Sequence, residues 1–168
     1  DPTRFQRQWG RKLIDKGASA VIGAHSHIVQ PEEFYEGKLI AHSLGNFVFG
    51  FYGVDTVEGL LAKAVFEDDN GAWNVKYADL VPIDVNNRRV FFKPKAFEGE
   101  EFQQAINKVI ELSQGFDTSI DVETGRVWVK GGPSEEAEMV KKSVITGNVL
   151  PFSKGEAEGI NDGLSTTQ

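Results

Sequence analysis

The 168-residue sequence predicts an α/β fold with a mixed sheet, C-terminal hairpins and an amphipathic helix. Three observations predict it. A helical pattern over 3–16 leads through a glycine into a short apolar run at 19–22, the succession found in layered α/β proteins. Hairpin patterns follow around Glu36-Gly37 and Asn70-Gly71. The segment 100–112 has apolar residues at helical spacing, which indicates an amphipathic helix.

The first predicted helix begins after the N-cap residue Thr3 and ends near Lys16, before a glycine in the C-cap position. Its apolar stripe, at i, i+4 and i+8, consists of Phe5, Trp9 and Leu13. The run 19–22 is bounded by glycines and short enough for a buried strand. This order places the residues that follow, from Gly23 on, at the carboxyl end of a strand, where ligands collect in open α/β sheets.

Three hairpins are expected along the chain. The first pairs 34–35 with 38–41, and the second pairs 60–66 with 73–82. A third would join Val85 to the run 90–92 around Asn86-Asn87. Nearer the C-terminus we expect a short strand at 126–130, a surface helix at 135–142 and a flexible tail at 155–168, which is rich in Gly, Ser, Thr and acidic residues.

Composition excludes several classes of protein. The chain has 18 Lys plus Arg against 25 Asp plus Glu, a formal charge of −7 with no basic stripe, so we expect no nucleic-acid partner. It has no cysteine, which excludes disulfides and thiolate zinc sites. Its apolar runs, such as 46–52, are far shorter than the roughly 20 residues that a membrane helix needs.

His25 and His27 are the candidate metal ligands. On extended backbone, residues two apart project to the same face, so both imidazoles can converge on one site. Neutral imidazole is a common ligand of zinc, iron and manganese, but a catalytic site needs further Asp, Asn or His ligands. The alternative interpretation is two surface or hydrogen-bonded loop histidines.

Other polar and glycine residues could line the same site: Gly23, Ser26, His42, Ser43 and Asn46. His42 could be a ligand or an acid–base group, but we favour a strand-end histidine hydrogen-bonded to backbone. Gly45-Asn46 favours a tight turn over chemistry, and Ser43 has no evident base partner for nucleophilic catalysis.

The aromatic and acidic residues have mainly structural interpretations. Most of the nearby aromatic residues are expected in the core, namely Phe34, Tyr35, Phe47, Phe49, Phe51 and Tyr52. Phe51, Tyr52 and Gly53 could instead line a substrate cleft. The adjacent acidic pairs are expected to be solvated, and they are Glu32-Glu33, Glu100-Glu101 and Glu135-Glu136.

Several segments resemble, in order, the bacterial capsule and poly-γ-glutamate synthesis (CapA/PgsA-type) family. The resemblance covers about residues 1–113 and rests on segments 17–31, 35–40, 43–49, 81–83, 92–94 and 111–113. That family resembles the calcineurin-like metallophosphoesterases, so the resemblance implies part of a four-layer αββα sandwich. It also implies a divalent metal pair, Mn, Fe or Zn, with Gly23, His25 and His27 as the last metal motif. Ala24 is inserted before the first histidine, and His42 stands where the family has a tyrosine.

The earlier metal motifs of that superfamily, an Asp-x-His, a Gly-Asp and an Asn-His-Asp/Glu cluster, do not occur in this sequence. The resemblance therefore implies the C-terminal half of such a domain at 1–113, followed by an extension at 114–154 and the tail at 155–168. The N-terminal half, or a second copy of the chain, would cover its exposed core surface. By itself the segment would lack two-metal catalysis.

The resemblance implies a function in capsule or poly-γ-glutamate biosynthesis. The intact domain would be a metal-dependent, phosphoesterase-like hydrolase, extracytoplasmic, at the cell surface or membrane-anchored, acting near a surface polymer or its precursor. A first alternative is a non-catalytic scaffold or polymer-binding module of a synthesis or export complex. A second is an interaction domain in which the histidine pair is structural.

Overall fold

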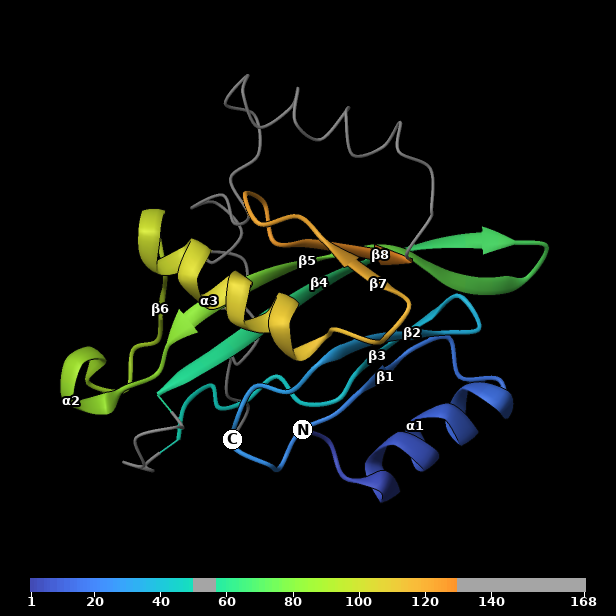
Figure 1. Ribbon diagram of the computed structural model, residues 1–168, viewed down its shortest axis with the longest axis horizontal. Helices are drawn as coiled ribbons and strands as arrows, with labels where there is room; N and C mark the ends of the chain where they lie inside the picture. The colour runs from blue at the N-terminus through green and yellow to red at the C-terminus, as the bar shows by residue number, and fades with distance from the viewer. Residues whose placement is uncertain (50–56, 130–168) are drawn as a thin grey trace, which may run out of the picture. The chain divides into compact units, whose positions relative to one another are not determined.

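The computed structural model describes residues 1–49 and 57–129, all within the compact unit Asp1–Gly132. The aromatic segment 51–53, the helix expected at 135–142, the acidic pair Glu135-Glu136 and the tail at 155–168 lie outside the described residues. The fold is α/β with two sheets, as the sequence predicts (Figure 1).

Helix α1 (Arg4–Asp15) confirms the first predicted helix. Thr3 and Gln6 form a reciprocal capping box, in which each side chain accepts a hydrogen bond from the other's backbone N–H. The helix buries Gly10 and Ile14 instead of its aromatic stripe. A Cβ at Gly10 would lie only 3.1 Å from Cγ2 of Ile40, so the missing side chain lets α1 pack closely on the sheet.

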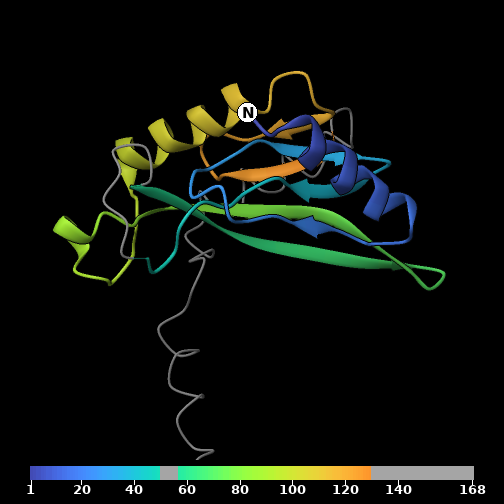
Figure 2. The same ribbon diagram turned by 90° about the horizontal axis from the view of Figure 1, so that it is seen from below.

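A three-stranded mixed sheet lies beside α1 (Figures 1 and 2), with the order β1-β3-β2. Strands β2 (Glu32–Tyr35) and β3 (Lys38–Ala41) form the first predicted hairpin, and β1 (Val21–Ile22) runs parallel to β3. The expectation of a buried strand at 19–22 is wrong in part. Only two residues pair, and Ile22 is exposed because β1 is an edge strand of this sheet.

The second sheet is built on the long predicted hairpin of β4 (Glu58–Asp69) and β5 (Ala72–Asp84). Asn70 and Gly71 have φ of 52° and 90°, the two positive angles that a tight hairpin turn of this kind requires. The order is β4-β5-β8-β7, with β7 (Thr118–Ile120), β8 (Arg126–Val129) and a short β6 (Lys95–Ala96) that pairs with β5.

Helix α3 (Gly99–Leu112) confirms the predicted amphipathic helix and packs against β5. One hydrophobic core joins the two sheets and α3. Its buried members are Phe34, Leu39, Leu60, Val75, Ala78, Leu80, Ile106, Val109 and Val127. No helix among the described residues is both long and apolar enough to cross a membrane.

The third predicted hairpin is wrong. In its place the chain forms a single helical turn, α2 (Asn87–Val90), capped by the Asn86 side chain, which accepts a hydrogen bond from the Arg88 N–H. Phe91 and Phe92 follow in the left-handed region, with φ of 50° and 61°, so the chain turns back instead of extending into a strand. An Asn cap favours the helical turn over a two-residue hairpin loop.

Candidate metal centre

The backbone of the histidine loop differs from the prediction. His25 and His27 have φ of 83° and 62°, so the loop is not extended and its side chains do not alternate as in a strand. The loop begins where Gly23 N–H donates to Ala41 O at 2.7 Å, and it is turned further by the Ser26 hydroxyl, which donates to Ile28 O at 3.1 Å. Two left-handed non-glycine residues so close together store strain, which proteins concentrate at functional sites.

The two imidazoles are nevertheless neighbours. Their ring centroids lie 6.0 Å apart with the planes tilted by 40°. His25 is exposed and His27 is half-buried. The turn of the loop, and not strand alternation, therefore brings the rings together.

Asn46 fixes the orientation of His27. Its Oδ1 lies 2.7 Å from Nδ1 of His27, and because an amide oxygen accepts, this contact is a hydrogen bond in the tautomer with the proton on Nδ1. In that tautomer Nε2 is the unprotonated ring nitrogen, the form in which imidazole binds a metal. The Phe49 ring packs against the imidazole at 4.5 Å between centroids. Metal-binding histidines usually donate their other ring N–H to an oxygen acceptor, which is the role that Asn46 Oδ1 would have here.

The residues present fit one part of a metal site. Within 1–49 and 57–129, no group of three or more His, Cys, Asp or Glu side chains is placed to hold a metal ion. His25 and His27 can supply two nitrogen ligands, whereas a catalytic metal usually takes three or more protein ligands. The donor set therefore fits a site to which other residues contribute.

The neighbouring predicted residues mostly shape the backbone. A Cβ at Gly23 would overlap the carbonyl oxygen of His42, so only glycine allows the two segments to approach. Gly45, predicted to lie in a tight turn, instead forms an antiparallel β-bridge with Gly59; its φ is 73°, and a Cβ there would lie 2.9 Å from Glu58 O. Ser43 is buried, and its hydroxyl accepts from the Gly45 N–H at 3.2 Å.

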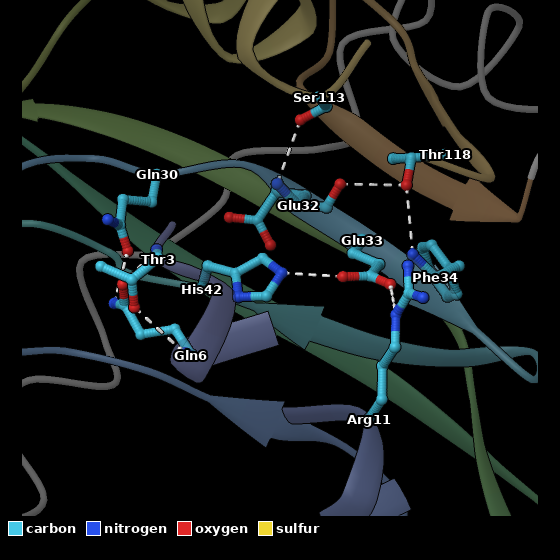
Figure 3. A network of polar contacts seen from close by, with 10 residues as sticks. All are labelled: Thr3, Gln6, Arg11, Gln30, Glu32, Glu33, Phe34, His42, Ser113 and Thr118. Carbon is cyan, nitrogen blue, oxygen red and sulfur yellow. Dashed lines mark hydrogen bonds and ion pairs between the residues drawn. The ribbon is translucent and has the colours of Figure 1, made fainter. Parts of the chain in front are cut away.

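His42 belongs to a different cluster, beneath α1. Its Nε2 donates to Oε2 of Glu33 at 2.8 Å, while the Arg11 Nε donates to Oε1 of the same carboxylate at 2.6 Å (Figure 3). The predicted backbone partner of His42 is therefore wrong, because the side chain of Glu33 takes that role. His42 does not join His25 and His27 in a common group of potential ligands.

Glu32 and Glu33 are both buried, so the prediction that this pair is solvated is wrong. Burial alone would raise the pKa of Glu33, but the hydrogen bonds from His42 and Arg11, with their charges, bring it below its usual value. Burial raises the pKa of Glu32 to about 8, and neither carboxyl oxygen has a hydrogen-bond partner in the described part of the chain. By contrast, Glu100 and Glu101 are exposed as predicted.

The aromatic residues divide differently from the prediction. Phe34 is in the core, but Phe47 and Phe49 are exposed together with Val48. These three follow Asn46, so an apolar surface adjoins the histidine loop. Sequence reasoning assigned Phe47 and Phe49 to the core because aromatic runs usually pack inside. The sequence did offer one signal of an exposed site, because this apolar run directly follows the candidate site residues Ser43 and Asn46.

Comparison with known proteins gives one family model and several relatives that match parts of the chain. The family model of the bacterial capsule synthesis protein PGA_cap matches residues 1–51. The PGA biosynthesis protein CapA of Bacillus subtilis is 49% identical over 86 residues, which are 51% of this chain and 22% of that protein.

Two further relatives match parts of the chain. The capsule biosynthesis protein CapA of Bacillus anthracis is 24% identical over 144 residues, 86% of this chain and 31% of that protein. An uncharacterized protein of Sinorhizobium fredii is 41% identical over 49 residues, 29% of this chain and 11% of its own length. The chain thus matches less than a third of the length of each of these relatives. Over the residues matched, it is similar to the CapA-type family of bacterial capsule synthesis proteins.

Proposed function

We propose that this chain is part of a capsule or poly-γ-glutamate biosynthesis protein, and that His25 and His27 are metal ligands of a phosphoesterase-like hydrolase. The Bacillus relatives are a PGA biosynthesis protein and a capsule biosynthesis protein, which supports the biosynthetic role. The single observation that carries the metal assignment is the contact of Nδ1 of His27 with Oδ1 of Asn46, because it favours the tautomer in which Nε2 could coordinate a metal.

The remaining metal ligands would come from residues beyond those described, in an N-terminal half of the domain. Two features support this. The aromatic stripe of α1 is exposed, and β1 is an edge strand with Ile22 exposed. Such an N-terminal half could add strands beside β1 and a layer that packs on the exposed stripe of α1. The result would approach a four-layer αββα sandwich.

Each residue has a defined task in this proposal. A divalent metal pair of Mn, Fe or Zn, when bound, supplies Lewis-acid activation of water and of a phosphoryl oxygen. His25 and His27 hold it through ring nitrogens, and Asn46 keeps the His27 ring in the required tautomer and orientation. Gly23 keeps the histidine loop close to the end of β3. The substrate class is a phosphoester in the precursor of a surface polymer.

Metal analysis of the complete protein tests the assignment. We expect stoichiometric Mn, Fe or Zn in the wild type and loss of metal and of phosphoesterase activity in His25→Ala and His27→Ala. Asn46→Ala should weaken metal binding by about 10- to 100-fold, as losses of such partners do. His42→Gln is the matched control, since it alters a histidine outside the loop and should leave the metal content unchanged. Full metal content in both alanine variants would reject the ligand role.

A non-catalytic scaffold is the second candidate. Two observations favour it: the described residues hold no three-ligand cluster, and several apolar residues beside the histidine loop are exposed. Capsule formation by cells that carry His25→Ala and His27→Ala separates the two functions. Normal capsule in both strains would support the scaffold, whereas its loss together with loss of metal would support the hydrolase.

A further inference from the structure

The turn after α2 combines exposed aromatic rings, unusual backbone and positive charge. Phe91 and Phe92 are 76% and 51% exposed, and both have positive φ. A left-handed conformation costs a bulky residue roughly 1–2 kcal/mol, so two in succession are not a default loop. The fold therefore holds two phenyl rings outward in a conformation that the backbone alone disfavours.

Specific contacts stabilise this conformation. The buried side chain of Asn87 accepts from the Phe92 N–H at 3.2 Å and donates to the backbone oxygen of Phe49. Val90 is buried beneath the turn, and its carbonyl accepts from the Lys93 N–H at 2.9 Å. The turn is thus a built structure, and Asn87 joins it to the segment whose Phe49 ring packs on His27.

The sequence around the two rings is basic although the whole chain carries −7. Between residues 88 and 96 there are four cationic side chains and no acidic one, and acidic residues resume at Glu98. All four are exposed, namely Arg88, Arg89, Lys93 and Lys95. Arg89 pairs with Asp84 at 3.0 Å, whereas Lys93 and Lys95 form no ion pair with the described residues.

We propose that this basic–aromatic turn, residues 88–96, docks on an anionic lipid bilayer, with Phe91 and Phe92 inserted between the headgroups. Phenyl rings have no polar group, so their partner must offer an apolar interior, and the flanking cations require negative charge in the same plane. An anionic bilayer offers both within a few ångströms. A soluble polyanion offers the charge but would leave the rings in water.

Vesicle sedimentation of the 168-residue chain tests the proposal. We expect binding to vesicles of equimolar phosphatidylglycerol and phosphatidylcholine, and little binding to phosphatidylcholine alone. Removing one cation, as in Lys93→Gln or Lys95→Gln, should weaken binding about fivefold, the factor for roughly 1 kcal/mol per basic residue. Added salt should weaken it further.

The aromatic test uses the double variant Phe91→Gly/Phe92→Gly, because glycine adopts positive φ without cost and therefore preserves the turn. We expect it to lose at least about tenfold in vesicle affinity while its thermal unfolding is unchanged. Phe66→Ala and Lys63→Gln are matched controls, since both residues are exposed on β4, and they should bind as the wild type does.

A second measurement reports insertion directly. In Phe92→Trp, brominated lipids in the phosphatidylglycerol vesicles should quench the new tryptophan more strongly than they quench the three native tryptophans of the wild type. Equal vesicle affinity of the glycine double variant and the wild type would overturn the proposal. So would absence of vesicle binding together with retention by immobilised poly-γ-glutamate, which would assign the turn to a polymer.

Discussion

Glu32 and Glu33 are adjacent in the sequence, yet the fold places their carboxyl groups in opposite environments. Successive strand residues face opposite sides of a sheet, so Glu33 reaches the α1 side, where Arg11 and His42 bond it. Glu32 faces the other side, and only its backbone is bonded, to Ser113 and Thr118 (Figure 3). Burial without a partner favours the protonated form of Glu32, whereas the hydrogen bonds and charges around Glu33 favour the ionised form.

Glu32 should make stability fall as pH rises towards 8. Its pKa is raised from 4.5 in the reference state to about 8 in the fold, so the folded state binds the proton more tightly. Its favourable contribution is complete below pH 4.5 and is lost as pH rises through 8, with a slope of up to about 1.4 kcal/mol per pH unit. Glu32→Gln removes this titration, so urea unfolding from pH 5 to 8 should show a flatter profile than the wild type.

Glu33→Gln serves as the comparison, because the pKa of Glu33 is lowered and its contribution has the opposite sign. That contribution is present above pH 4.5 and is lost as the pH falls below it. Between pH 5 and 8 the Glu33 variant should therefore be less stable by a nearly constant amount. Parallel profiles of the wild type and Glu32→Gln over that range would contradict the assignment of a neutral Glu32.

Helix α1 has apolar residues on two sides, one exposed and one buried. The predicted stripe, Phe5, Trp9 and Leu13, is exposed, whereas Ile14 packs against the sheet. Adjacent residues on a helix point about 100° apart, so Leu13 and Ile14 form a matched pair within one turn. Stability of the described unit should depend much more on Ile14 than on Leu13.

We expect Ile14→Ala to lower the free energy of unfolding of the chain by about 2–4 kcal/mol, because it leaves a cavity beneath the helix. Leu13→Ala should change it much less, by about 0.5–1 kcal/mol, since Leu13 is 46% exposed. Urea denaturation of both variants measures the difference. Equal losses of unfolding free energy in the two variants would show that the stripe is covered in solution. If these losses depend on protein concentration, the cover is a second copy of the chain.

The elements that sequence reasoning predicted are those with local causes. The Thr3 cap fixes the start of α1, and the Asn70-Gly71 pair fixes the turn between β4 and β5. The burial of Glu33 could not be predicted in this way, because Arg11 reaches it from 22 residues away. The left-handed backbone of His25 and His27 was not predicted either, and it follows a tertiary contact, the close approach of Gly23 to the end of β3.

For the candidate site too, local features could be predicted from the sequence and tertiary contacts could not. The sequence suggests that the imidazoles of His25 and His27 converge, and the structure places their ring centroids 6.0 Å apart by a different backbone geometry. The hydrogen bond between His27 and Asn46 was not predicted, because it joins positions 19 residues apart. Sequence reasoning gave Asn46 a turn role, and the structure adds a side-chain contact that no local pattern contains.

At the scale of the whole molecule, the described unit leaves two apolar features uncovered side by side. Helix α1 packs on β1 and β3, its exposed stripe includes Trp9, and the edge strand β1 carries the exposed Ile22. Unpaired strand edges and apolar patches of this kind are usually covered in a complete protein. An N-terminal half of the domain beside β1 would cover both and bring further ligands towards His25 and His27.

The environment of Trp9 can test whether an N-terminal half packs against α1. In the complete protein we expect Trp9→Gln to lower the free energy of unfolding by about 2–4 kcal/mol, whereas in the 168-residue chain, where Trp9 is 46% exposed, the loss should stay below about 0.5 kcal/mol. Trp73→Gln is the matched control, because Trp73 lies near the start of β5, is 53% exposed and should behave alike in both lengths. Iodide quenching, compared with Trp9→Phe, should show Trp9 shielded only in the complete protein. An equal effect of Trp9→Gln in both lengths would mean that the domain is completed elsewhere, because docking against α1 must remove this side chain from water.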